Sequence, residues 1–240
     1  MSETLSSIVQ RDDRVATAAA LHVEVIADFV CPFCFIGKRQ LDEALKAVQG
    51  PYELSWNPFQ LNPDIPAEGL PFDIYLTKRF GNPANVEPVL EHLAEQGKTS
   101  GIQFRFDRIR HVPNTLPVHQ LMQHAATVGA DQTAIADHLM SAFFEDGSNI
   151  GQRGILIDVA QAHGIAPKET VEAIDSDRIR QIVATREAQV RSSGLAGAPG
   201  FLLNSRLLVV GAQPADNMIT AFDRAMFGEG ADSLVAPALH

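Results

Sequence analysis

Strand-like segments stand near both ends of this chain, and helix-like segments occupy most of the sequence between them. Near the start, Leu21–Phe29 and Tyr52–Phe59 carry alternating or mostly apolar side chains, which is typical of strands. Near the end, Phe201–Leu203 and Leu207–Val210 are short apolar runs separated by three polar residues, a pattern that predicts a tight hairpin. We therefore expect an α/β fold in which segments far apart in the chain close one sheet.

A helix is expected after the first strand, and a mostly helical block follows the second. Its helix-compatible segments are separated by glycine- and proline-containing breakers; they are Val86–Gln96, Leu116–Val128, Ile135–Phe144, Gly154–His163 and Arg178–Ser192. A last helix is expected at Pro214–Phe227, with apolar residues along one face.

These patterns divide the chain into parts. Segments 21–62 and 195–228 form one discontinuous α/β domain in this interpretation, and 63–194 is a large helical insertion. The ends, 1–20 and 229–240, are expected to be flexible.

Composition limits the classes of function. With 240 residues, 45% of them apolar, the chain can bury a substantial core. A formal net charge of -10 argues against a protein that binds nucleic acids or anionic membranes through general electrostatic attraction. The first 20 residues have no apolar segment of a secretory signal, and no stretch approaches the roughly 18 apolar residues of a membrane span. We expect a cytoplasmic protein.

The two cysteines of the chain are Cys31 and Cys34, placed where the first strand gives way to a helix. At a helix start, unpaired N–H groups and the helix dipole favour a thiolate, so Cys31 is the predicted nucleophile, with a pKa below that of a free thiol. Cys34 lies one turn on, where it can resolve a mixed disulfide, and is expected to be the more buried thiol. Pro32 suits a first helical turn, and Phe33 offers an apolar contact to a substrate.

Two other interpretations of the cysteines remain open. A Cys-x-x-Cys pair is half of a zinc site, and His119 and His124 have finger-like spacing. Five residues on one helix turn the second histidine about 140° from the first, however, and the chain has no second cysteine pair. Alternatively, both cysteines are structural and inert. A pair that follows a strand and opens a helix favours redox chemistry, and we expect no metal.

A proline-containing loop precedes the C-terminal hairpin. It contains Ala198 and Pro199, flanked by glycines. A proline in such a tight turn can adopt the cis form, although an ordinary loop proline fits the sequence as well. Its position between the helical block and the returning strands favours the cis form.

Five segments carry a resemblance to a known family: ADFVCPFCFIGKRQLDEAL, WNPFQLNP, NTLPVHQLMQHA, FFEDGSNIG and APGFLLNSRLLVVGAQP. They resemble the FrnE-like branch of the DsbA family of oxidoreductases, collinearly from about Val23 to Phe227. The resemblance implies a thioredoxin-like fold with a large helical insertion, dithiol–disulfide exchange, and a cis-proline at Pro199 whose loop packs against the cysteine motif. The related 2-hydroxychromene-2-carboxylate isomerases and kappa-class glutathione transferases typically carry a serine at the position of Cys31 and use glutathione.

The chain departs from the family pattern beside the proline. Ala198 stands where members often have valine or threonine, and Gly200 where a larger residue is usual, so less bulk surrounds Cys31. Asn114 and His119 match a polar helix start that faces the active site in the family, and both are candidate substrate contacts. Asn114 is equally a plain N-cap, and His119 equally a packed histidine.

The leading hypothesis is a thiol–disulfide oxidoreductase that acts on protein or small-molecule thiols. A glutathione-dependent isomerase or transferase with a small aromatic or polyketide-like substrate is the alternative, and a chaperone or interaction protein with a vestigial site is a third class. We expect no required cofactor, with glutathione as a candidate co-substrate. The family also makes a homodimer a candidate assembly.

Overall fold

The computed structural model describes residues 20–228. The ends that the sequence predicts to be flexible, 1–20 and 229–240, lie outside this range except for residue 20.

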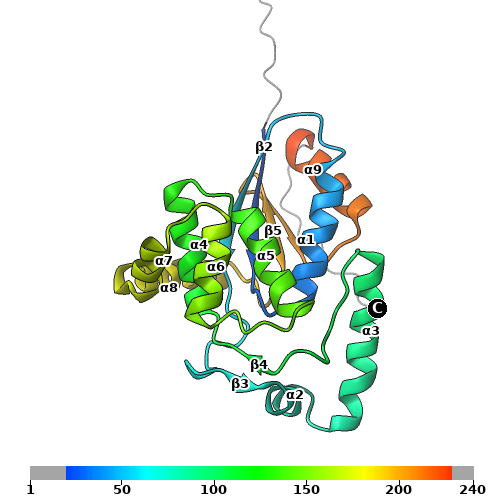
Figure 1. Ribbon diagram of the computed structural model, residues 1–240. Helices are drawn as coiled ribbons and strands as arrows, with labels where there is room; N and C mark the ends of the chain where they lie inside the picture. The colour runs from blue at the N-terminus through cyan, green and yellow to red at the C-terminus, as the bar shows by residue number, and fades with distance from the viewer. Residues whose placement is uncertain (1–19, 229–240) are drawn as a thin grey trace, which may run out of the picture.

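A four-stranded mixed sheet forms the centre of the molecule (Figure 1), in the order β2-β1-β5-β6. The strands are β1 (Leu21–Ala27), β2 (Tyr52–Pro58), β5 (Gly200–Leu203) and β6 (Leu207–Val210). β1 pairs in parallel with β2, and antiparallel with β5, which pairs antiparallel with β6. The predicted sheet, closed by distant segments, is therefore confirmed, as is the tight hairpin.

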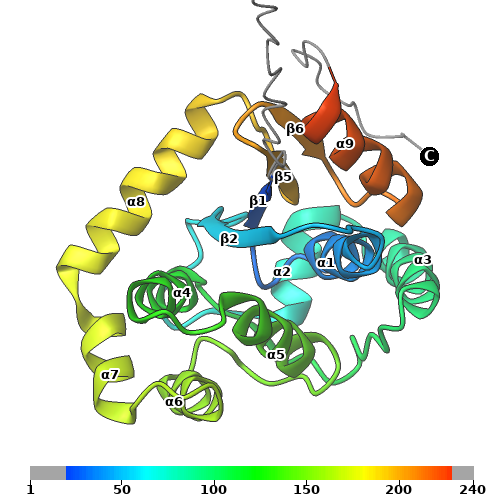
Figure 2. The same cartoon turned by 90° about the horizontal axis from the view of Figure 1, so that it is seen from above.

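Both faces of the sheet are covered by helices. On one side, α1 (Pro32–Leu45) and α9 (Ala215–Phe227) pack together, and on the other α8 (Asp177–Ser192) packs on β2 (Figure 2). Strand β1 buries one face along its whole length, through Leu21, Val23, Val25 and Ala27, whereas on the other face His22 is exposed and Glu24 is half-buried. Val23 and Val25 belong to the main core, whereas Ile26 packs in a second cluster with Phe59.

The remaining elements lie between β2 and β5 in the chain. They are β3 (Leu70–Pro71), α2 (Phe72–Phe80), a short 3-10 helix (Pro83–Asn85), α3 (Val86–Thr99), β4 (His111–Val112), α4 (Leu116–Val128), α5 (Gln132–Phe144), α6 (Arg153–Ala162) and α7 (Pro167–Asp175). Helices α4 and α5 contact the edge strand β2. By contrast, α2, β3 and β4 lie at the end of the sheet from which α1 starts (Figure 1).

The sequence missed three features of this region. Helix α2 was not predicted, because proline and glycine residues surround it and hide its apolar spacing. Helix α7 was not predicted either; it begins at Pro167, since proline can interrupt a helix but is also well suited to a first helical turn. Two-residue strands β3 and β4 pair antiparallel, so the insertion is not wholly helical. Within residues 20–228, no helix has the length and apolar character that crossing a membrane requires.

Candidate active site

Cys31 is the N-cap of helix α1. Its backbone is extended (φ -98°, ψ 113°), and its Sγ accepts a hydrogen bond from the backbone N–H of Cys34 at 3.3 Å. Pro32 occupies the first helical turn, where a missing N–H costs nothing. Phe33 is 45% exposed, as expected of a contact residue. The sulfur of Cys31 therefore stands at the positive end of the helix dipole.

The two cysteines lie 3.1 Å apart and are free thiols. Each residue is 2% exposed, so the prediction that Cys34 is the more buried of the two is wrong by this measure. They differ in what they face, because Cys31 lines a large cavity and Cys34 does not. Burial raises the pKa of Cys34 well above its ordinary value, and the neighbouring Cys31 raises it further. Cys34 therefore keeps its proton until a nearby group accepts it.

The proline loop lies across from Cys31. The Ala198–Pro199 peptide bond is cis, as the loop position favours, and the Sγ–H of Cys31 points to the carbonyl oxygen of Ala198 at 3.7 Å. Gly37 permits this close approach, since a Cβ there would lie 3.1 Å from both Pro199 Cγ and Phe201 Cζ. Sequence analysis missed Gly37, and its only signal is a glycine inside an otherwise regular helix.

Beneath the cysteines lies Asp28, which is fully buried. Its backbone N–H donates to Cys34 Sγ at 3.5 Å. Its carboxylate accepts the backbone N–H groups of Phe29 at 2.9 Å and of Leu61 at 2.8 Å. A buried carboxylate without such donors would be costly, so the bend after β1 is built around Asp28.

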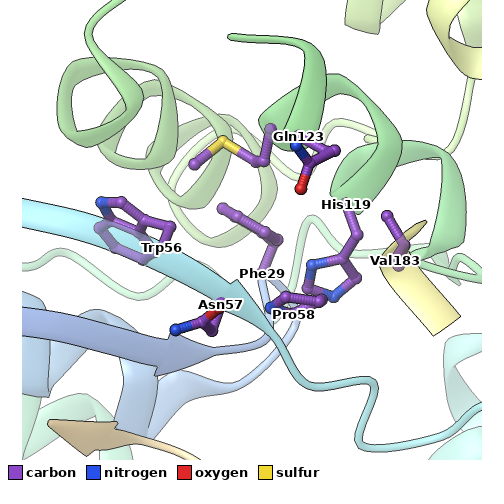
Figure 3. A pocket seen from close by; sticks show the side chains of 8 residues that line it. Phe29, Trp56, Asn57, Pro58, His119, Gln123 and Val183 are labelled. Carbon is purple, nitrogen blue, oxygen red and sulfur yellow. The ribbon is translucent and has the colours of Figure 1, made fainter. Parts of the chain in front are cut away.

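His119 lies against this carboxylate. It is 3% exposed, and its Nε2 is 3.4 Å from Asp28 Oδ1. The ring packs edge-on against Phe29, with ring centroids 5.3 Å apart. Figure 3 shows it reaching from α4 toward Phe29 and Pro58, beside a cavity of only about 10 Å³, which is room for about one water molecule. His119 therefore occupies the packed position, behind the cysteine motif.

Asn114 ties the start of helix α4 to the loop that follows strand β2. Its Oδ1 accepts the backbone N–H of Leu116 at 2.9 Å, and its Nδ2 donates to the carbonyl of Ile65 at 2.7 Å. The bond from Leu116 resembles the N-cap bond predicted for Asn114, although the N-cap residue of α4 is Thr115. Neither Asn114 nor His119 lines the large cavity beside Cys31, and their contact with a substrate stays a prediction from the sequence.

A cavity of about 430 Å³ opens beside Cys31. Cys31, Pro32, Phe33 and Ala198 line it, and the insertion supplies most of the opposite wall through α2 and α3. Sequence analysis missed this wall, because α2 was not recognised. Among the described residues, no three His, Cys, Asp or Glu side chains are grouped to hold a metal ion.

One family profile spans most of the chain. The DSBA-like thioredoxin domain matches residues 22–223. The chain belongs to this family. A curated relative, the uncharacterized protein YwbO of Bacillus subtilis (strain 168), is 25% identical over 190 residues, which cover 78% of this chain and 89% of YwbO.

Several solved structures share the fold. A "probable DsbA oxidoreductase" from Streptomyces coelicolor superposes with a TM-score of 0.79 at 24% identity, covering 91% of this chain and 94% of its own. The cytosolic disulfide reductase DsbM from Pseudomonas aeruginosa gives 0.57 at 16% identity, with 85% and 95% covered. A 2-hydroxychromene-2-carboxylate isomerase gives 0.62 at 13% identity, with 85% and 95% covered. The predicted thioredoxin-like fold with a helical insertion is confirmed.

Proposed function

We propose that this DSBA-like protein is a thiol–disulfide oxidoreductase in which Cys31 attacks a disulfide and Cys34 resolves the product. One observation carries the proposal: two free thiols lie 3.1 Å apart at the start of a helix, and only the first of them faces the large cavity. Membership of a family whose solved neighbours include a disulfide reductase supports the same chemistry.

The exchange proceeds in two displacements. The Cys31 thiolate attacks one sulfur of a substrate disulfide, so that a mixed disulfide forms and a first thiolate leaves. The Cys34 thiolate then attacks Cys31 Sγ, and the second substrate thiolate leaves. The substrate gains two electrons and the protein retains a Cys31–Cys34 disulfide. The reverse sequence oxidises a substrate dithiol.

Loss of the Cys34 proton is the step that needs help, because burial raises the pKa of this thiol. Asp28 is the adjacent buried carboxylate, held by two backbone N–H groups, and His119 lies behind it. In this proposal Asp28 accepts the proton as Cys34 attacks. The backbone N–H groups of Phe29 and Leu61 keep the carboxylate oriented, and His119 packs behind it.

The proposed reaction requires no bound cofactor. A dithiol or small thiol, glutathione among the candidates, supplies electrons to the Cys31–Cys34 pair. We place the activity in the cytoplasm, where a similar fold serves a cytosolic disulfide reductase. The substrate is a protein or small-molecule disulfide. A homodimer stays a prediction from the sequence.

A turnover assay tests this proposal. Wild-type protein should catalyse reduction of insulin or of a small disulfide by dithiothreitol, and Cys31→Ser should lower the rate to that of the uncatalysed reaction. Because serine is close in size to cysteine, the circular dichroism and melting temperature of the variant should stay near wild type. Full activity in folded Cys31→Ser would refute the mechanism.

The cavity supports a second candidate function. A volume of about 430 Å³ falls in the range of small-molecule sites, which suits a glutathione-dependent isomerase or transferase. That chemistry needs no resolving thiol, so Cys34→Ala should leave it intact. Under the leading proposal, the same variant accumulates the mixed disulfide and loses turnover.

A further inference from the structure

The cavity beside Cys31 has strongly apolar walls. Helix α2 turns one face toward it through Phe72, Tyr75, Leu76 and Phe80, residues spaced as on one side of a helix. No residue of α2 is fully buried, although this face is apolar. The face thus borders the cavity, with Phe72 and Tyr75 partly buried against the main core, and an apolar ligand would bury it further.

The charged side chains that line the cavity are all positive. The charged residues that line the cavity among those described are Arg79 and Arg191, with no Asp, Glu, Lys or His. Arg191 is already neutralised, because its Nη2 lies 2.6 Å from Glu187 Oε1. Arg79 is exposed and makes no ion pair with a described carboxylate. Although the chain has a net charge of -10, Arg79 makes the cavity beside Cys31 favourable for an anion.

Two uncharged polar groups complete the lining. Burial raises the pKa of the Tyr75 hydroxyl, so it stays a hydrogen-bond donor, while the nearby Asn62 and Arg79 side chains offset part of that rise. Asn62 also lines the cavity, and its Nδ2 is buried without a hydrogen-bond partner among the described residues. The lining therefore offers the Tyr75 hydroxyl as a neutral donor and Arg79 as an available cation.

We propose that this cavity binds a small disulfide whose halves each carry an apolar, ring-sized body and one negative charge, held for attack by Cys31. The proposal rests on the proposed oxidoreductase function and names its substrate class. The apolar body packs on the α2 face, and Arg79 attracts the charge.

The same lining disfavours glutathione disulfide and extended peptides. Each half of glutathione disulfide carries two peptide groups, two carboxylates and an ammonium group. The described lining contains no acidic side chain for the ammonium group and few partners for the amides. Burying such groups without partners costs more than leaving them in water.

Atoms and electrons balance in two displacements, the attack of Cys31 on the substrate disulfide and the attack of Cys34 on the mixed disulfide. One aromatic thiolate leaves when Cys31 forms the mixed disulfide, and the second leaves when the Cys31–Cys34 disulfide closes. Dithiothreitol, a dithiol, reduces the protein before the experiment and is then removed.

Single-turnover rates of the reduced protein test the proposal. The substrates are 5,5′-dithiobis(2-nitrobenzoate), neutral 4,4′-dithiodipyridine, glutathione disulfide and neutral 2-hydroxyethyl disulfide. Each rate is divided by the rate of free dithiothreitol with the same disulfide, which removes differences in intrinsic reactivity. The normalised rate for the carboxylated aromatic disulfide should exceed that for glutathione disulfide by at least about tenfold.

Arg79→Ala supplies the decisive variant. It should lower the normalised rate for the carboxylated aromatic disulfide about fivefold, the size of a partly exposed charge contact, and leave the neutral aromatic disulfide unchanged. Lys78→Ala, an exposed neighbour on α2 that does not line the cavity, is the matched control and should change neither rate.

The outcomes separate the two proposals. Equal or faster normalised reduction of glutathione disulfide, or an Arg79→Ala effect equal for charged and neutral substrates, would overturn the substrate class while leaving the oxidoreductase intact. If no disulfide reacts with Cys31, the proposed function itself fails.

Discussion

At Gly37, helix α1 lies close to Pro199 of the proline loop. Gly37 lies on the turn after Cys34, and an added Cβ would meet Pro199 and Phe201 at 3.1 Å. Such a contact is tighter than ordinary van der Waals packing, so one of the partners must move by a few tenths of an ångström. Because the same loop presents the Ala198 carbonyl to Cys31, the movement would reach the reacting sulfur.

Gly37→Ala should slow disulfide exchange severalfold while leaving stability nearly unchanged. Alanine improves the helix by about 1 kcal/mol, and the close contact offsets that gain. Gly154→Ala is the matched control, since Gly154 is a helical glycine with nothing within 4 Å of an added Cβ. It should raise the free energy of unfolding without changing the exchange rate. Equal exchange rates in the two variants would contradict the role of Gly37.

The raised pKa of Cys34 makes the stability of the reduced protein depend on pH. Below the ordinary thiol pKa of 9.0, both folded and unfolded chains hold this proton, and its contribution to stability is fully present. As pH rises from there toward the folded-state pKa, only the unfolded chain releases the proton. The folded state therefore loses up to about 1.4 kcal/mol per pH unit.

Urea unfolding between pH 8 and pH 10, in the presence of a phosphine reductant, checks this dependence. The free energy of unfolding should fall more steeply in wild type than in Cys34→Ala, in which the titrating thiol is absent. Parallel pH profiles for the two proteins would show that Cys34 has an ordinary pKa in the folded state.

At the scale of elements, a charged cluster joins α1 to α5. Lys38, 5% exposed, places its Nζ 2.7 Å from Asp42 and 2.9 Å from Asp137, and Arg39 lies 2.8 Å from the same Asp137. Helix α5 also contacts β2, where Trp56 Nε1 donates to Thr133 Oγ1 at 3.1 Å. The cluster thus orients α1, and with it Cys31, against the insertion.

Lys38→Met should destabilise the protein by about 2 kcal/mol, because it leaves Asp42 and Asp137 with less compensation at a partly buried site. Chemical denaturation measures the change. Lys46→Met removes an exposed ion pair with Glu43 at the C-terminal end of α1 and should have little effect. A similar small effect of Lys38→Met would show that α5 does not depend on the cluster.

The sequence predicted elements well where apolar spacing and end signals agreed. Helix α4 has the predicted bounds Leu116–Val128, with Pro117 near its start and Gly129 after its end. Helix α2 was not predicted because its apolar face lines a cavity and the segments before and after it are rich in turn residues. The structural roles of Asp28 and Gly37 were not predicted for a different reason, since they arise from contacts with Leu61 and Pro199 that no local pattern encodes.

At the scale of the whole molecule, the site assembles from three distant parts of the chain. The strand β1 and helix α1 supply the thiols, β5 and its preceding loop supply the facing carbonyl, and α2 with α3 closes the cavity. The cysteine motif and proline loop could be predicted because their residue types constrain local backbone geometry. The cavity could not, because its shape depends on how the insertion packs against the sheet.

Trapping the mixed disulfide tests the central claim most directly. Reduced Cys34→Ala should accumulate a stable adduct with 2-hydroxyethyl disulfide on Cys31, detected by mass spectrometry of its peptides. Wild type treated in the same way should end as the Cys31–Cys34 disulfide with no adduct. The account would be contradicted if Cys31→Ser formed an adduct on Cys34 at a comparable rate, or if wild type retained the adduct.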